Sequence, residues 1–137
     1  MARDTRTGDV LEQMVLPALE SGGFQHRSGV NSGRRLGLGR HKVDVLAQKD
    51  DHTYLVSLKW QQVSGTAEQK IPFEVISLAH AMQEGDYSRA YLVLGGDGWS
   101  LRDFYTGGGL NEHLSHPELV VILTLERFIA LANQGAL

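Results

Sequence analysis

The sequence predicts an α/β fold in which a central mixed β-sheet is flanked by helices. Helical and strand patterns alternate along the chain. The continuous apolar run Ala90–Leu94 is typical of a central strand covered on both faces. The length of 137 residues is enough for one domain and too short for two domains with separate cores. We therefore expect residues 1–137 to form a single domain.

The N-terminal half is expected to hold one helix and then three strands. Apolar residues recur at three- and four-residue spacing from Gly8 to Glu20, with Thr7 as the helix cap. Pro17 inside this pattern should kink or shorten the helix. A glycine-rich hairpin follows, whose second strand spans Lys42–Gln48, and a turn then leads to the strand Thr53–Trp60.

The C-terminal half is expected to alternate helices and strands. Its first helix, Thr66–Glu84, begins with a capping box formed by Thr66 and Gln69, and Pro72 should disturb the early turns. Thr124 is the expected cap of the last helix. The other elements, in order, are the strand Ala90–Leu94, a short helix at Leu101–Tyr105, the strand Leu119–Leu123 and the helix Leu125–Asn133.

Composition excludes several classes of protein. Hydrophobic residues make up 42% of the chain and charged residues 21%, which is typical of a globular domain and not of a disordered tail. No apolar run approaches the roughly 18 residues of a membrane span, and the first residues do not resemble a secretory signal. The absence of cysteine excludes disulfides and thiolate metal sites. We expect a cytoplasmic protein without a membrane partner.

Basic residues gather in one segment although the net charge of the chain is −3. No acidic residue lies between Glu20 and Asp44. A local positive field of this kind favours a polyanion such as DNA, whereas the alternative is a solvated, flexible hairpin. The basic residues of this segment are Arg27, Arg34, Arg35, Arg40 and Lys42.

The second and third strands hold the residues with the clearest chemical potential. Alternation places Val43, Val45 and Ala47 on one face of the second strand and Asp44 on the other. If the two strands pair as a hairpin, Asp44 and Lys59 come out on the same face near one end. An acid and a lysine on buried strands are costly unless they pair with each other or serve a metal.

This pattern resembles the PD-(D/E)xK nuclease superfamily, which includes type II restriction endonucleases and archaeal-type Holliday junction resolvases. Asp44 is followed thirteen to fifteen residues later by Ser57-Leu-Lys59, after one helix and before another. The resemblance implies a restriction-endonuclease-like fold. Val43 stands in place of the motif's proline, and Ser57 stands where the second metal-binding acid is usual.

A subgroup of restriction endonucleases is similar in having serine at this position, with the carboxylate supplied by the following helix. The resemblance therefore favours Glu74, fourteen residues after Trp60, and Glu68 is the competing candidate. At about 100° per residue, each glutamate lies within about 60° of the helix's apolar stripe, on opposite flanks. Without the motif, both would be ordinary glutamates at the flank of a helix.

The resemblance also implies roles for these residues. Asp44 and Glu74 would hold Mg²⁺, for which Mn²⁺ would substitute, and Lys59 would orient or deprotonate the attacking water. Glu12 matches a position where many family members carry an acid near the metal, although it fits a solvent-facing helix residue equally well. Gln61 and Gln62 are candidates for positioning water or DNA, against the alternative of exposed loop residues.

The function expected from this reading is that of a Mg²⁺-dependent DNA endonuclease. Because one active site cuts one strand, double-strand cleavage would require a homodimer. One alternative is a catalytically inactive DNA-binding or assembly module that kept the nuclease fold, and another is an α/β protein that handles a small metabolite. The residues expected to contact DNA phosphates are Arg34, Arg35, Arg40 and Lys42.

Overall fold

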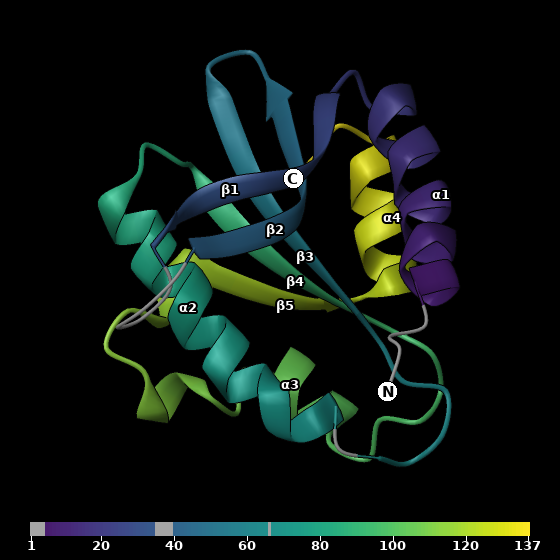
Figure 1. The fold of residues 1–137 in the computed structure, drawn as a ribbon, viewed down its shortest axis with the longest axis vertical. Coiled ribbons are helices and arrows are strands. Elements are labelled where there is room, and N and C mark those ends of the chain that lie inside the picture. The colour runs from purple at the N-terminus through teal and green to yellow at the C-terminus, as the bar shows by residue number, and fades with distance from the viewer. Residues whose placement is uncertain (1–4, 35–39, 66) are drawn as a thin grey trace.

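A computed structural model describes residues 5–34, 40–65 and 67–137 of the chain. It contains a five-stranded sheet in the order β1-β2-β3-β4-β5 (Figure 1). The strands are β1 (Gln25–Arg34), β2 (Arg40–Lys49), β3 (His52–Trp60), β4 (Arg89–Gly95) and β5 (Val120–Thr124). The α-helices are α1 (Thr5–Ser21), α2 (Ile71–Glu84), α3 (Arg102–Thr106) and α4 (Leu125–Asn133), and 3₁₀ turns lie at Ala67–Lys70, Asn111–His113 and Pro117–Leu119.

The sheet changes from antiparallel to parallel pairing at its middle strand. β1 pairs antiparallel with β2, and β2 pairs antiparallel with β3. β3 then pairs parallel with β4, and β4 pairs parallel with β5. A parallel pair needs a crossover connection, which α2 supplies between β3 and β4. The predicted mixed sheet is therefore confirmed, and β3 lies at its centre.

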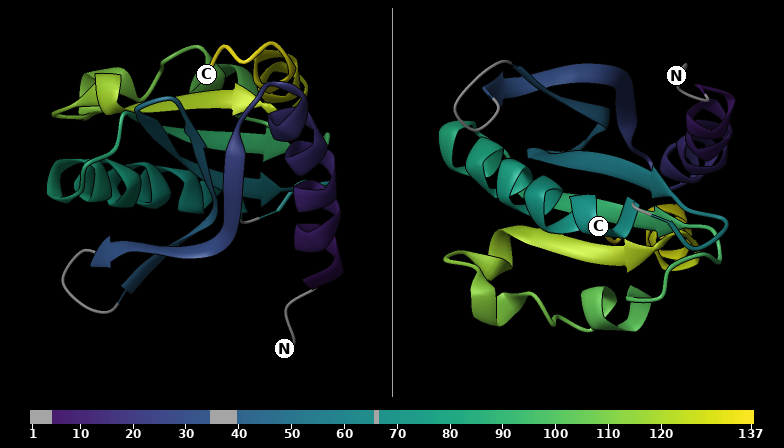
Figure 2. Two further views of the ribbon diagram at one scale, coloured as in Figure 1. Left: turned by 90° about the horizontal axis from the view of Figure 1, so that it is seen from above. Right: turned by 60° about the horizontal axis from the view of Figure 1, so that its bottom comes forward.

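Helices cover both faces of the sheet and create two cores. Figures 1 and 2 show α1 and α4 side by side on one face and α2 on the other. The first core includes Val15, Leu19 and Phe128, and the second includes Leu55 and Leu78. All five side chains are essentially inaccessible to solvent, and burial of apolar surface of this kind is the main stabilising term in folding.

The β1–β2 ribbon bends where it leaves the sheet. β1 changes direction sharply along its length (Figure 2, left). Gly29 adopts a left-handed conformation with φ of 61°, and it lies between the paired residues Ser28 and Val30, opposite Asp44. On the other side of β2, described pairing with β3 ends at Val45. Asp44 therefore lies just beyond the described pairing with β3, whereas the register of β2 with β1 is unchanged from Gln25 to Asn31.

The end of this pairing coincides with a correction to one prediction about β2. Val43 does not share the environment of Val45 and Ala47, because it packs in the core beneath α2 while they pack in the core beneath α1 and α4. The simple alternation of a flat strand therefore fails between Val43 and Val45, where the described pairing with β3 ends. On β3, Tyr54, Val56 and Leu58 all pack in the core beneath α1 and α4.

The prolines disturb the helices less than expected. α1 begins at Thr5, so Thr7 lies inside the helix and not at its cap, and the helix continues through Pro17 to Ser21. Pro17 is exposed, so the carbonyl group that its ring leaves without an intrahelical partner is on the solvent side. The expected shortening of this helix is therefore wrong.

The second predicted helix starts later than expected. α2 begins at Ile71 after a 3₁₀ turn, which places Pro72 within the first helical residues, where its missing N–H costs nothing. No side chain caps α2, and Thr66 of the predicted capping box lies outside the described residues. The predicted cap of α4 is confirmed, because Thr124 Oγ1 accepts the Arg127 N–H at 3.2 Å.

Candidate active site

The central strand β3 brings together two carboxylates from other elements. Asp44 of β2 and Glu74 of α2 hydrogen-bond to the consecutive β3 residues Ser57 and Leu58. Lys59 is the next residue of the same strand. The residues of the sequence motif therefore lie where β2, β3 and α2 meet, at the middle of the sheet.

The side chain of Asp44 can contact β3 because the described backbone pairing between β2 and β3 ends at the adjacent residue, Val45. The last described pair on this side is Val45 with Val56. Asp44 Oδ2 accepts the backbone N–H of Leu58 at 2.7 Å, a length typical of a hydrogen bond to an ionised acceptor. The carboxylate therefore takes the place of a backbone carbonyl group, and the side chain is held against β3 while remaining partly exposed.

Glu74 reaches the same strand from the first turn of α2. Its Oε1 accepts a hydrogen bond from Ser57 Oγ at 3.1 Å. Both side chains are buried, with Ser57 2% and Glu74 9% exposed. Burial of a carboxylate is costly without polar partners, so the hydroxyl group of Ser57 stabilises Glu74 in this position. Ser57, predicted only as a missing acid, is therefore a hydrogen-bond donor to Glu74, the glutamate that the resemblance favoured.

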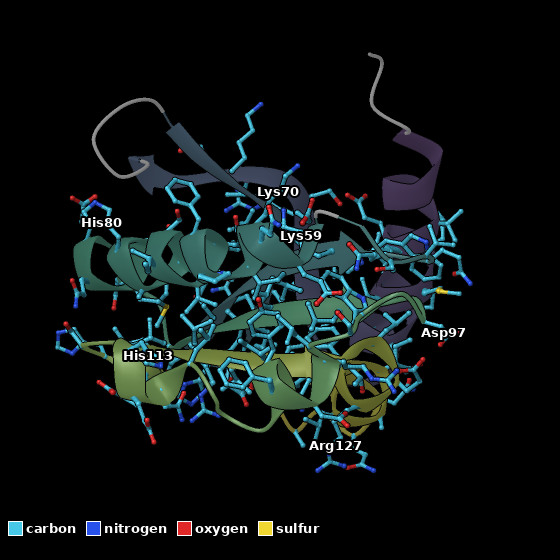
Figure 3. All side chains as sticks on the ribbon, turned by 90° about the horizontal axis from the view of Figure 1, so that it is seen from below. Lys59, Lys70, His80, Asp97, His113 and Arg127 are labelled. Atoms are coloured by element: carbon cyan, nitrogen blue, oxygen red, sulfur yellow. The ribbon has the colours of Figure 1, made fainter. Side chains whose placement is uncertain are left out.

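Lys59 lies at the end of β3 that faces the start of α2. It is half-buried and shares a strand face with Ser57, two residues before it. Lys70, an exposed residue that was not among the predicted site residues, directly precedes α2. Figure 3 labels Lys59 and Lys70 at the end of α2 away from His80. The sequence signal that could have identified Lys70 is its position four residues, or about one helical turn, before Glu74.

The donor set at this site fits a hard divalent cation. Within residues 5–34, 40–65 and 67–137, no group of three or more His, Cys, Asp or Glu side chains is arranged to hold a metal. Asp44 and Glu74 are two carboxylates held at consecutive residues of β3, and Glu12 lies half-buried on α1. Mg²⁺ is usually held by one or two carboxylates together with waters and substrate phosphates, so a carboxylate pair is sufficient.

Glu68, the competing candidate, contacts a different part of the molecule. Its Oε1 accepts hydrogen bonds from Gln61 Nε2 at 3.0 Å, the Ser100 N–H at 2.7 Å and Ser100 Oγ at 2.9 Å. Its Oε2 accepts the Leu101 N–H at 2.9 Å and lies 3.1 Å from Ser100 Oγ. Hydrogen bonding, chiefly from the Ser100 backbone, lowers the pKa of Glu68 below 4.5, although burial opposes this shift.

The two candidate glutamines have separate environments. Gln61 is buried, and its Nε2 donates to Glu68 and to the Gly98 carbonyl oxygen at 2.8 Å. Gln62 is exposed in the loop after β3. Gln61 is thus part of the contact between two loops, whereas Gln62 faces solvent beside the site. The backbone donors of Ser100 and Leu101 were not predicted, because main-chain groups leave no pattern in a sequence.

The basic residues of the hairpin are only partly described. Arg27 of β1 and Lys42 of β2 are exposed, and Lys42 lies two residues before Asp44. Arg34 and Arg40 end and begin the paired strands, facing each other in the register, and Arg35 lies outside the described residues. Of the residues predicted to contact phosphates, Arg34, Arg40 and Lys42 therefore lie on the β1–β2 ribbon, which also carries Asp44.

Comparison with known proteins identifies related sequences and folds. A family model described as a PD-(D/E)XK nuclease superfamily domain matches residues 3–136. No curated protein matches the chain. Among the described residues, no helix is long and apolar enough to cross a membrane.

Solved structures share the fold at low sequence identity. An XisH family protein from Nostoc punctiforme PCC 73102 aligns with a TM-score of 0.50 at 19% identity, covering 88% of this chain and 94% of that protein. An fdxN element excision controlling factor protein from Anabaena variabilis aligns with a TM-score of 0.51 at 16% identity, with the same coverage. A protein of unknown function, AF1548, aligns with a TM-score of 0.54 at 13% identity. The alignment covers 86% of this chain but only 56% of AF1548. The mixed five-stranded sheet flanked by helices is the restriction-endonuclease-like fold.

Proposed function

Because the chain belongs to the PD-(D/E)XK nuclease superfamily, we propose that it is a Mg²⁺-dependent endonuclease that hydrolyses phosphodiester bonds in DNA. The observation that carries this proposal is the approach of Asp44 and Glu74 to consecutive residues of β3. Lys59 follows these residues directly. The three side chains are those required for hydrolysis assisted by a metal: two hard oxygen donors and one cation.

Asp44 and Glu74 would hold Mg²⁺, with Mn²⁺ as a substitute. When bound, the cation supplies charge stabilisation for the phosphate and lowers the pKa of a coordinated water. Ser57 fixes the orientation of Glu74, and the Leu58 N–H fixes that of Asp44. Because both carboxylates are positioned by the same strand, their relative placement does not depend on a mobile loop.

Lys59 orients the attacking water and places positive charge next to the phosphate. In the hydrolysis, the water oxygen forms a new bond to phosphorus, and the bond from phosphorus to the leaving sugar oxygen breaks. The attacking water loses one proton and the leaving oxygen gains one, so the products are a phosphate monoester and a free hydroxyl group. A positioned acid–base group typically contributes about 10²- to 10⁴-fold to such a reaction.

The DNA backbone would be held by basic residues near the two carboxylates. Lys42 lies two residues before Asp44, and Lys70 lies four residues before Glu74, and both are exposed. Together with Arg34, Arg35 and Arg40 of the hairpin segment, they would form contacts that do not depend on DNA sequence. One site cuts one strand, so we propose that a homodimer is needed for double-strand cleavage.

The experiment is plasmid nicking in the presence of Mg²⁺ and in the presence of a chelator. We expect supercoiled DNA to be nicked only when the metal is present, and Lys59→Ala to lower the rate by about 10²-fold or more. Gln83→Ala, an exposed residue near the far end of α2, serves as the control and should leave the rate unchanged. Cleavage that persists in chelator or in Lys59→Ala contradicts the proposed mechanism.

A second candidate function rests on Ser57, which stands in place of an acid. A protein that kept the fold but lost a metal ligand would bind DNA or assemble with partners without cutting. Substitution Ser57→Glu separates the two functions. If wild type is inert and Ser57→Glu creates nicking, the chain is a binding module. If wild type nicks DNA and Glu74→Ala abolishes the activity, Glu74 is the replacement for the missing acid.

A further inference from the structure

The side chain of Glu68 joins two loops at the end of β3 and β4. The segments concerned are the β3–α2 connection and the loop from β4 to α3. We define the Glu68 clamp as the hydrogen-bonded group formed by Gln61, Glu68, Gly98, Ser100 and Leu101. Tyr105 of α3 adds a hydrogen bond from its hydroxyl group to the Glu68 carbonyl oxygen at 2.8 Å.

The carboxylate of Glu68 has no capacity left for a metal. It receives four donors, namely the side-chain amide of Gln61, two backbone N–H groups and the hydroxyl group of Ser100. A carboxylate accepts about four hydrogen bonds. A metal at Glu68 would therefore have to displace hydrogen bonds that these four donors already make. The role of Glu68 is thus different from the role of Glu74.

The clamp fixes the point at which α2 begins. Gln61 extends the pairing of β3 with β4, because its N–H donates to the Gly95 carbonyl oxygen at 3.0 Å and its own carbonyl oxygen accepts the Gly98 N–H at 2.8 Å. Gly96 must be glycine at this contact: its φ is 91°, and a Cβ there would lie 2.4 Å from the Gln61 carbonyl oxygen. Glu68 then ties the 3₁₀ turn before α2 to this fixed loop.

The position of this helix start determines which β3 residue Glu74 can reach. Glu74 lies six residues after Glu68, in the first turn of α2. The rise of an α-helix is about 1.5 Å per residue, so a displacement of α2 by one residue would break a hydrogen bond of 3.1 Å between Ser57 and Glu74. The clamp therefore acts on Glu74 through the helix and does not touch the reacting atoms.

We propose that Glu68 is a positioning residue whose saturated carboxylate holds α2 in the register that places Glu74 at the active site. This role rests on the proposed function, because it requires Glu74 to hold the metal. Glu68→Gln removes half of the acceptor capacity and turns an amide group toward backbone donors. In a folded protein we expect this variant to bind Mn²⁺ about tenfold more weakly and to nick DNA with a lower kcat and an unchanged KM.

The test measures Mn²⁺ affinity by electron paramagnetic resonance at a temperature well below the melting temperature of each variant. Glu84→Gln, at the exposed far end of α2, is the matched control for loss of a glutamate charge and should bind Mn²⁺ as wild type does. If Glu68→Gln does not fold, Ser100→Ala decides, because it removes a hydroxyl donor and keeps both backbone donors. We expect it to weaken Mn²⁺ binding by about two- to tenfold.

The outcomes separate this proposal from the proposed function. Wild type that binds no Mn²⁺ overturns both. Wild type that binds Mn²⁺ while a folded Glu68→Gln binds it equally well overturns the positioning role alone and leaves a purely structural clamp. A weaker Mn²⁺ affinity in Glu68→Gln or Ser100→Ala, with Glu84→Gln unchanged, supports the positioning role.

Discussion

Glu68 and Glu74 lie six residues apart and have opposite surroundings. Glu68 accepts two backbone N–H groups, an amide and a hydroxyl group, whereas Glu74 accepts the hydroxyl group of Ser57 on the central strand. Both side chains are buried. The comparison teaches that burial alone does not distinguish a carboxylate held by backbone donors from one proposed as a metal ligand. The donors to Glu68 are the more informative observation, because a metal would have to displace them.

The largest effect that would sharpen this comparison is expected for Glu74→Gln. The amide keeps an oxygen that can accept from Ser57, so the fold should remain intact by circular dichroism. Loss of a metal-binding carboxylate removes several kcal/mol of transition-state stabilisation, so nicking should fall about 10³-fold or more. If Glu74→Gln nicks DNA at the wild-type rate, the two glutamates do not differ as proposed.

A smaller effect is expected for Ser57→Ala, which leaves both glutamates in place. The substitution removes the hydrogen bond that orients Glu74, and loss of such a partner typically lowers metal affinity or activity by about tenfold or more. Titration of Mn²⁺ into each variant measures the change. Ser64→Ala, in the exposed loop after β3, is the control, and an equal effect of the two substitutions would contradict the role of Ser57.

The stability of the fold at acidic pH tests the role of the Glu68 carboxylate. The pKa of Glu68 is lowered in the folded state below its ordinary value of 4.5, chiefly by the Ser100 backbone N–H. The ionised carboxylate therefore contributes stability above pH 4.5, and this contribution is lost as pH falls through the lowered pKa. Urea unfolding should show a difference in the free energy of unfolding between wild type and Glu68→Gln that is largest at pH 7 and shrinks below pH 4.5. A difference that is independent of pH would contradict this assignment.

The smallest effect on turnover is expected from the hairpin, which belongs to neither glutamate's surroundings. Replacing Arg34 and Arg35 together by alanine should flatten the slope of log affinity against log salt by about one to two units, because each phosphate contact contributes about −0.9. The turnover of bound DNA and the fold should not change. The measurement is DNA binding by fluorescence anisotropy at several salt concentrations, and an unchanged affinity and slope would show that this basic segment is only a solvated loop.

The sequence predicted most of the fold because the periodic patterns are long. The strand expected at Thr53–Trp60, the buried run in β4 and the Thr124 cap of α4 all match the structure. Failures occur where tertiary contacts override local rules. Val43 packs in the core beneath α2, beyond the described pairing of β2 with β3, and Pro72 falls within the first residues of a helix whose start is set by the preceding 3₁₀ turn.

The candidate site was predictable in its residue types but not in its contacts. The spacing of Asp44, Ser57 and Lys59 indicated the motif. In the structure Asp44 accepts the Leu58 N–H of β3, and Ser57 donates to Glu74 of α2. Helical geometry alone left Glu68 and Glu74 as alternatives. Two of the donors to Glu68 are backbone groups more than thirty residues away in sequence, and no side-chain pattern records them.

The change from antiparallel to parallel pairing at β3 has a consequence for the order of folding. β2 and β3 are joined by a tight turn, with Lys49 paired to His52, whereas Tyr54 of β3 pairs with Arg89 of β4, 35 residues later. Contacts between distant residues form more slowly because a longer loop must close first. Asp44 can thus reach its place on β3 early, while Glu74 depends on the later docking of the crossover helix. We therefore expect the second carboxylate to be positioned after the first, so the proposed cleavage of DNA depends on the slower, long-range pairing of β3 with β4.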